Sequence, residues 1–326
     1  MRAHFQSALP GLTRFALNAA PSGAKIRVCP GIYKEQVAIS KFLTINGDNG
    51  AIVMPSSMLT NRTSLASGNP ISGVILVQNA TDVTLSGLIV DGANNGVTTC
   101  GTDLIGIYYR NASGTVQKNT VRNMKLGPGL EGCQSGLGIY VQSRLGKSKV
   151  TIDTNSVHDF QKNGIQIAFG ATGTVDSNIA ANHVWSPCVS LNVCTDIATD
   201  ILVYSSDGIE ITRNIAGRSQ SGVFVQANNS NVHDNNVFDT LVFDGIGFQG
   251  DNNKASNNTI TKSDESGVFV DGKNNKVTGN TIQDAPIGVL KTTASAGTVI
   301  QGNTYINVLI PVVDPPAAGG KASAYR

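Results

Sequence analysis

The sequence predicts an all-β solenoid, in which short parallel strands stack coil upon coil with a period of about 22 residues. Three observations support this prediction: an asparagine that recurs at that interval, apolar residues on both sides of it, and a second alternating run in each repeat. The stretch 252–290, "NNKASNNTITKSDESGVFVDGKNNKVTGNTIQDAPIGVL", shows the pattern twice in succession. Because the period is much longer than one strand, each repeat must be a unit of several strands that stacks on its neighbours.

The recurring asparagine marks one turn of every repeat. An apolar residue lies three positions before it and a mostly apolar one two positions after it, and Leu88 takes the same place in an earlier coil. Stacked coils would bring the asparagines into a ladder, where side-chain amides bond to one another along the solenoid. We therefore expect them to hold turns and to do no chemistry. The positions are Asn119, Asn155, Asn178, Asn214, Asn235, Asn258, Asn280 and Asn303.

Each repeat also contains a second run in which apolar residues alternate with other residues. The runs read "IGIYYR", "LGIYVQ", "NGIQIA", "DILVYS", "SGVFVQ", "DGIGFQ" and "SGVFVD". A period of two indicates strands and not helices. Three short strands within about 22 residues leave no room for hairpins, so equivalent strands must pair in parallel with the next coil, about 4.8 Å away.

The repeat pattern resembles that of the right-handed parallel β-helix proteins, the superfamily of pectate lyases and pectinesterases. The stretch 24–53, "AKIRVCPGIYKEQVAISKFLTINGDNGAIV", is similar to the first coils of such proteins. The resemblance implies a single-domain right-handed parallel β-helix over 24–310, with three strands in each coil. We expect 1–23 to cap its start with a short amphipathic helix at 5–20, and 311–326 to form a loose C-terminal tail.

Composition excludes several classes of partner. Only 14% of the residues are charged and the net charge is +2, with no basic stripe or acidic block, so no nucleic acid is expected. No apolar run reaches the roughly 20 residues of a membrane span. The N-terminal residues do not form a clear signal peptide. We expect an extracellular or periplasmic protein from which any leader has already been removed.

Five cysteines bear on the compartment. Cys100 and Cys133 lie in equivalent Gly-rich loops of neighbouring coils, so a disulfide between them is reasonable, and a bridge between Cys188 and Cys194 would tie off a third loop. Cys29, in the first strand, would be the odd, buried thiol. Disulfides imply export. Reduced thiols in a cytosolic protein are the alternative, and no spacing is typical of zinc.

Three intervals between repeats are longer than the period. The extra residues form loops at 91–104, 124–136 and 183–200, each inserted before the next Gly-Ile or equivalent strand. All three would therefore overhang one edge of one face. In solenoids, insertions of this kind gather on one face, which is often the binding face.

On the predicted strand face beside these loops, alternate residues point outward. They combine aromatic rings, which suit the apolar faces of sugars, with amides that suit hydroxyl groups. For Tyr108 and Tyr140, coverage by the inserted loops is an equally good interpretation. The predicted substrate-binding residues are Tyr108, Tyr140, Gln142, Gln166, Tyr204, Phe224, Gln226, Phe269 and Asp271.

Chemistry on a uronic acid chain needs a base for the ring proton and a cation for the developing carboxylate charge, often with Ca²⁺. Arg110 supplies a permanent cation beside Tyr108, and His158, Asp159 and His183 lie near the loops. These are the candidate catalytic residues. Alternatives stay open: Arg110 as a solvated strand residue, the histidines as surface turn residues, and Asp159 as a turn cap. The sequence itself assigns no cofactor, metal ligand or oligomeric state.

The resemblance implies an exported carbohydrate-active protein that binds an acidic polysaccharide along this face and processes it as a lyase or epimerase. The catalytic signatures of polygalacturonases, alginate epimerases and pectate lyases are absent. Their absence favours the alternative, a non-catalytic polysaccharide-binding or adhesion solenoid. A third interpretation is a periplasmic assembly role, as in β-helix proteins that mature copper centres. Against it, four scattered histidines and few methionines are a thin ligand supply for copper.

Overall fold

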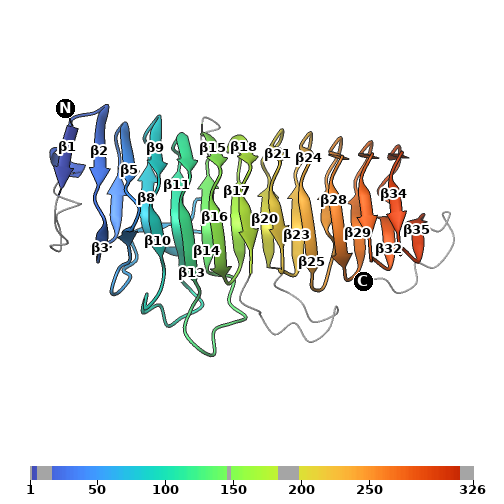
Figure 1. Cartoon of the computed structure of the whole chain (residues 1–326), viewed down its shortest axis with the longest axis horizontal. Helices are drawn as coiled ribbons and strands as arrows, with labels where there is room; N and C mark the ends of the chain where they lie inside the picture. Colours follow the sequence, from blue (N-terminus) through green and yellow to red (C-terminus); the bar gives the residue numbers. More distant parts are fainter. Residues whose placement is uncertain (1, 6–16, 145–147, 183–197, 316–326) are drawn as a thin grey trace.

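The computed structural model describes residues 2–5, 17–144, 148–182 and 198–315, which wind into a solenoid of three stacked sheets (Figure 1). Each coil passes through one strand of each sheet, in the order A, B, C, and the next coil pairs with it in parallel and in register. The parallel β-helix that the repeat predicts is thereby confirmed.

The strands are grouped below by sheet, in stacking order. Sheet A contains β1 (Arg2–Phe5), β2 (Ala24–Val28), β5 (Leu43–Gly47), β9 (Val83–Ser86), β12 (Gly114–Gln117), β15 (Lys149–Asp153), β18 (Thr172–Asp176), β21 (Glu210–Thr212), β24 (Asn231–His233), β27 (Lys254–Ser256), β30 (Lys276–Thr278) and β33 (Val299–Gln301). Sheet B contains β3 (Gly31–Tyr33), β6 (Ala51–Val53), β10 (Ile89–Asp91), β13 (Thr120–Met124), β16 (Ser156–Phe160), β19 (Ile179–Ala181), β22 (Ile215–Gly217), β25 (Asn236–Thr240), β28 (Thr259–Ser263), β31 (Thr281–Gln283) and β34 (Thr304–Ile306). Sheet C contains β4 (Val37–Ile39), β8 (Pro70–Gln78), β11 (Asp103–Arg110), β14 (Leu137–Gln142), β17 (Asn163–Ala168), β20 (Thr199–Tyr204), β23 (Ser221–Gln226), β26 (Ile246–Gln249), β29 (Ser266–Asp271), β32 (Ile287–Lys291) and β35 (Ile310–Val313), with β7 (Arg62–Thr63) attached to β8.

The first residues differ from the predicted helix at 5–20. Phe5 ends β1, which pairs in parallel with β2, so this position belongs to a strand because its backbone extends sheet A. Residues 6–16 lie outside the described part of the chain, and 17–19 are helical. Leu17 packs into the core, as a cap residue would. Among the described residues, no helix has the length and apolar character needed to cross a membrane.

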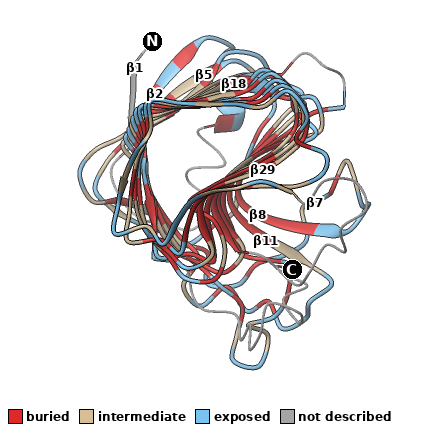
Figure 2. Cartoon of the chain, turned by 90° about the vertical axis from the view of Figure 1, so that its right-hand side faces the viewer, coloured by how far each residue is buried: buried red, intermediate tan, exposed pale blue. Residues whose placement is uncertain are grey.

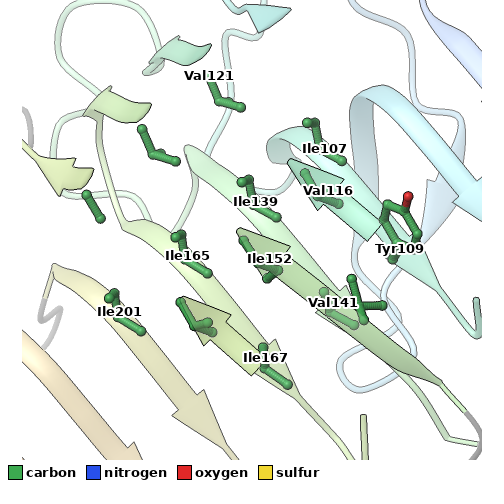
Figure 3. Packing of buried hydrophobic residues seen from close by; sticks show 14 of the residues in the cluster. Ile107, Tyr109, Val116, Val121, Ile139, Val141, Ile152, Ile165, Ile167 and Ile201 are labelled. Carbon is green, nitrogen blue, oxygen red and sulfur yellow. The ribbon is translucent and has the colours of Figure 1, made fainter. Parts of the chain in front are cut away.

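Alternation along the strands of sheet C builds the core. Ile107, Ile139, Ile165 and Ile201 occupy one position in four successive coils, and all four side chains are fully buried inside the solenoid (Figure 3). Branched side chains stack well at such repeated positions. Each coil therefore buries its apolar face against its neighbours, and the buried residues line the inside of the solenoid (Figure 2).

The recurring asparagines form the predicted ladder at the corner between sheets A and B. The Oδ1 atom of Asn155 accepts hydrogen bonds from the backbone N–H (3.0 Å) and from Nδ2 (3.1 Å) of Asn119. The next rungs, to Asn303, repeat both bonds. Leu88 donates its N–H to Asn119 Oδ1 (3.0 Å), as its matching sequence position predicts. The amides thus satisfy backbone groups that a sharp, buried corner would otherwise leave unpaired.

The long insertions leave the solenoid at the corner between sheets B and C. The predicted disulfide between Cys100 and Cys133 is present and joins the loops that follow β10 and β13, with the Cα atoms 5.1 Å apart. Cys188 and Cys194 lie outside the described residues, so the second predicted bridge stays a prediction. Cys29 is in no disulfide, and it is half-buried, not buried as expected, because it follows β2 at a corner and does not lie within the strand.

Candidate functional site

A segment that the repeat pattern did not reveal, residues 59–69, crosses the outer face of sheet C, and we call it the strap. Within it, β7 pairs antiparallel with β8. Gln142 Oε1 accepts a hydrogen bond from the N–H of Leu65 (2.8 Å), and Arg110 Nε donates to the carbonyl of Thr63 (3.1 Å). The strap therefore crosses β8, β11 and β14, and side chains of the face hold it through its backbone.

Three predicted binding residues lie beneath or against the strap. Tyr108 and Tyr140 are buried, with their rings stacked at 5.3 Å between centroids. The Tyr108 hydroxyl donates to Oε1 of Gln142 (2.5 Å), which is also buried. Burial raises the pKa of the Tyr108 hydroxyl well above its usual value. Of the two interpretations left open for Tyr108 and Tyr140, the structure therefore favours coverage, although the strap is not one of the loops expected to provide it. The exposed position expected for Gln142 is wrong, because a satellite apolar cluster forms there outside the solenoid core and the strap binds its side chain.

Beyond the strap, from β17 to β29, the outward positions of sheet C hold side chains that are half-buried or exposed, apart from the buried Ala168 and Gly247. We call this set of residues the strip. They occupy two outward positions in successive coils, as the register of the strands shows. The strip consists of Gln166, Leu202, Tyr204, Phe224, Gln226, Gly247, Gln249, Phe269 and Asp271.

Aromatic rings and amides alternate along the strip. Tyr204 is 38% exposed. The ring of Phe224 lies over Gly247, where an added Cβ would come within 2.3 Å of two ring carbons, so only glycine leaves room for the ring to lie against the sheet. Gln226 Nε2 donates to Gln249 Oε1 (2.6 Å), which fixes two adjacent amides in line. Flat rings beside fixed amides form a surface suited to sugar rings and their hydroxyls.

The predicted catalytic residues do not share one site. Arg110 ends β11 on sheet C beside the strap, whereas His158 and Asp159 lie on β16 in sheet B. His158 Nδ1 and Asp159 Oδ2 are 2.7 Å apart, so these two neighbours form a pair with each other. His183 lies outside the described residues. The structure thus brings together His158 and Asp159 and places Arg110 on another sheet.

Asp103, at the start of β11, has a carboxyl group with a raised pKa. Burial raises its pKa from 3.8 to about 6. A raised pKa in the folded state means that folding favours the protonated form. The stability linked to this group is therefore complete below pH 3.8 and is lost as the pH rises through about 6.

We expect Asp103→Asn to be more stable than the wild type above pH 6, by up to about 3 kcal/mol, with no difference below pH 3.8. Thermal unfolding of both proteins at the two ends of this range tests the prediction, and an equal difference at both would contradict it.

A pocket of about 620 Å³ lies on the corner between sheets B and C. Asp239 faces two cations across it, Arg218 at 3.9 Å and Lys262 at 3.5 Å. Equivalent positions in neighbouring coils hold Asp159 and Asn182, and all five residues adopt positive φ. Opposite charges thus alternate from Arg218 through Asp239 to Lys262, and we interpret the row as stabilisation of a tight turn. The sequence suggested a turn cap at Asp159 but not the cations at the equivalent positions.

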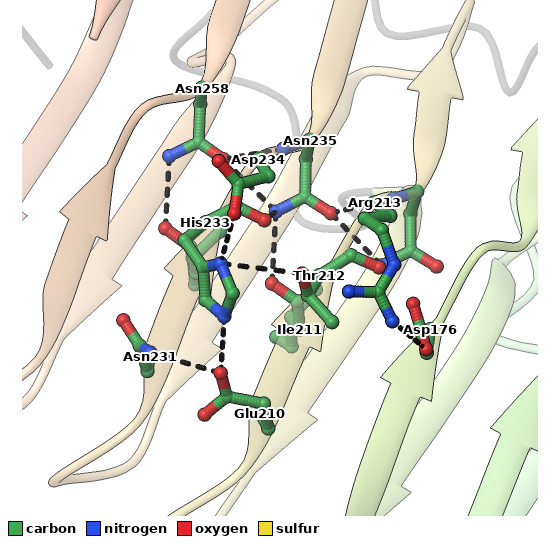
Figure 4. Close-up of polar contacts among 12 residues, drawn as sticks. Asp176, Glu210, Ile211, Thr212, Arg213, Asn231, His233, Asp234, Asn235 and Asn258 are labelled. Carbon is green, nitrogen blue, oxygen red and sulfur yellow. Dashed lines mark hydrogen bonds and ion pairs between the residues drawn. The ribbon is translucent and has the colours of Figure 1, made fainter. Parts of the chain in front are cut away.

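His233 on sheet A belongs to a second polar cluster, which the sequence did not suggest (Figure 4). Its Nδ1 lies 2.6 Å from Asp234 Oδ2, and its Nε2 contacts Glu210. Burial alone would lower the pKa of His233, but the two carboxylates outweigh burial and raise it. The carboxylates contact opposite ring nitrogens and do not converge. Across the described residues, no group of three or more His, Cys, Asp or Glu side chains is arranged to hold a metal ion.

Comparison with known proteins gives one family match and a set of similar folds. The profile of the family described as periplasmic copper-binding protein (NosD) matches residues 138–315, more than half of the chain. No curated protein sequence matches the chain. Similar solved structures include a DFA-IIIase from Arthrobacter chlorophenolicus A6 in complex with GF2, at 13% identity and a TM-score of 0.54, which covers 90% of this chain and 81% of that one.

Two further structures have similar scores. A GH136 lacto-N-biosidase from Eubacterium ramulus is 10% identical with a TM-score of 0.57, over 90% of this chain and 64% of that one. The alginate lyase AlyF-OU02 in complex with G6 is also 10% identical, with a TM-score of 0.56, over 88% and 60%. The chain thus spans less than two thirds of these two proteins. Identities this low establish a shared fold and nothing finer.

Proposed function

Since the chain belongs to the family of periplasmic copper-binding proteins described as NosD, we propose that it acts in the periplasm, where it binds a neutral polysaccharide along the strip. The disulfide between Cys100 and Cys133 supports the compartment, because disulfides persist where the environment is oxidising. Two observations support a polysaccharide ligand: the side chains that make up the strip, and the row of outward positions that the strip shares with the strap.

The family is described as copper-binding, but the side chains that the structure describes do not offer a suitable set of copper ligands. Copper prefers thiolate, thioether and imidazole ligands. Met58 and Met124 are buried in the core, Met54 is half-buried, and Cys29 is the one free cysteine among the described residues. The rings of His158 and His233 each contact a carboxylate. The described residues therefore do not fit a copper site, and we derive no step through this metal.

The observation that supports a linear ligand is the path of the strap. The outward position that holds the strap's backbone, through Arg110 and Gln142, continues along the solenoid through the buried Ala168 to Tyr204, Gln226 and Gln249. On β11 and β14, this row of side chains binds an extended chain that crosses the strands. From Tyr204 onward the same row is half-buried or exposed, and it offers the same kind of contacts to another extended polymer.

The charge of the strip favours a neutral polymer over the acidic one expected from sequence. Uronate chains are usually held by arginine or lysine, because charge-assisted bonds to carboxylates are strong. The strip contains neither residue type, and its one charged member is Asp271, whose Oδ1 accepts a hydrogen bond from Thr292 (2.5 Å). Like charge would repel a uronate chain here, whereas amides and rings suit uncharged sugars. The similar folds of a DFA-IIIase and a lacto-N-biosidase agree with a saccharide ligand.

Binding to a panel of neutral and uronate polysaccharides tests the proposal. We expect retention by neutral polymers, and we expect Tyr204→Ala and Phe269→Ala each to weaken binding about tenfold, or about 1.4 kcal/mol, because a stacked ring is lost. Phe238→Ala is the matched control, since Phe238 is a half-buried ring on sheet B that packs against Arg218. Tighter binding to uronates, or equal losses in all three variants, would contradict the proposal.

A further inference from the structure

The C-terminal end of the solenoid leaves three strand edges without a strand partner in the described structure. β33, β34 and β35 are the last strands of sheets A, B and C, and each pairs with a strand of the preceding coil only. They stand together at one end of the long axis (Figure 1). Their other edges present backbone N–H and C=O groups of the kind that readily pair with another chain.

This end is apolar as well as open. Leu309 is 83% exposed, and Val299, Ile306 and Ile310 are exposed too. Ile300, Tyr305, Val308 and Val312 pack against the core but keep part of their surface accessible. We call these eight residues the end surface. Exposed apolar residues gathered in one place usually mark an interaction site.

The last coil also lacks most of the features that protect strand edges. Residues 299–313 contain no Asp, Glu, Lys or Arg, although charged side chains are the common way to keep an edge from pairing. Pro311 removes one N–H from β35, which blunts that edge in part. β33 and β34 contain no proline. At the opposite end, by contrast, β1 extends sheet A and Leu17 packs into the core.

We propose that the end surface is the contact between two copies of this chain, joined end to end across a two-fold axis. An uncharged, apolar surface can meet its own copy without repulsion, and a two-fold contact sets the same patch against itself and closes after two copies. Strand edges that meet in this way also gain backbone partners.

The composition of residues 316–326 makes this segment a poor candidate to cover the end surface in place of a second copy. Their sequence, PAAGGKASAYR, has one large ring and otherwise consists of small residues, proline and two basic residues. Alanine, glycine, proline and lysine are depleted in strands. The segment thus lacks the alternating apolar residues that each coil of this solenoid uses to cover its neighbour. This inference does not depend on the proposed polysaccharide ligand.

Molar mass measured by light scattering tests the proposal on the full chain. The chain has a mass of 34.0 kDa, so we expect twice that value for the wild type. Val299→Lys combined with Leu309→Lys should return the mass to 34.0 kDa, because two like charges from each copy would meet at the contact. Ile215→Lys is the matched control. Ile215 is 38% exposed on β22 in the middle of the solenoid, and its replacement should leave the dimer intact.

Circular dichroism and thermal unfolding of each variant distinguish loss of the dimer from loss of the fold. A wild type that stays at 34.0 kDa up to its solubility limit would overturn the proposal. A folded dimer that survives the double substitution would overturn it as well. Species that grow beyond two copies would show head-to-tail contacts in place of the two-fold contact.

Discussion

Replacing Asn178 with alanine is expected to lower the free energy of unfolding by about 3–5 kcal/mol, because a fully buried side chain that makes five hydrogen bonds is lost. Asn178 Oδ1 accepts the N–H and the Nδ2 of Asn155, both at 2.9 Å. Its Nδ2 donates to the carbonyls of Ile152 and Asp176, both at 2.9 Å, and to Oδ1 of Asn214 at 3.1 Å. Alanine removes these bonds at a corner that is fully buried and out of contact with bulk water. Chemical denaturation of the purified protein gives the difference directly.

Asn303→Ala is the matched control for the ladder. Asn303 is the last rung, and it is only half-buried, so water can replace the amide that is lost. We expect a loss of no more than about 1.5 kcal/mol there, because water can take up much of what its three hydrogen bonds provide. Equal losses at both rungs would contradict the view that burial, and not the side chain alone, makes the ladder stabilising.

Gly138→Ala is expected to destabilise the protein by about 3 kcal/mol through overpacking. A Cβ atom at this position would lie 2.3 Å from Cγ1 of Val157 and 2.5 Å from the carbonyl oxygen of Gly164, the next glycine along the solenoid. Neither neighbour can move freely, since one is a core side chain and the other is backbone of a paired strand. The glycine that precedes Ile or Val in the repeats is thus required by close approach between coils. Thermal and chemical unfolding measure the loss.

Gly132→Ala separates this effect from the intrinsic preference of alanine over glycine. Gly132 lies in the loop after β13, and a Cβ there would meet nothing within 4 Å. We expect no loss of stability, or a slight gain from reduced freedom of the unfolded chain. A Gly138→Ala protein as stable as Gly132→Ala would show that the coils can separate enough to admit a methyl group.

Most of the architecture follows from the period of the sequence. A residue that recurs once in every coil must stack on the equivalent residue of the next coil. The spacing of Asn119 and Asn155 alone therefore predicts the ladder. The same logic places Ile107 and Ile139 inside the solenoid, and it sets Cys100 opposite Cys133 in equivalent loops. These predictions concern contacts between equivalent positions, which periodicity determines.

The features that periodicity could not reveal come from segments without a repeat. The strap has no counterpart in other coils, so the burial of Tyr108 and Tyr140 could be framed only as one of two alternatives. Alternation predicted which way Gln142 points, but not that Ser64 and Leu65 would take up its amide. Likewise, the position that Arg218 and Lys262 occupy holds a different type of residue from coil to coil. Their pairing with Asp239 depends on which residue the neighbouring coil supplies.

A crystal structure of the protein with a neutral oligosaccharide is the most direct test of the proposed binding face. We expect sugar rings to lie over Phe224 and Phe269, with hydroxyl groups bonded to Gln226 and Gln249, and with the chain running across the strands as the strap does. Sugar bound instead in the pocket beside Arg218 and Asp239, with the strip empty, would contradict the account.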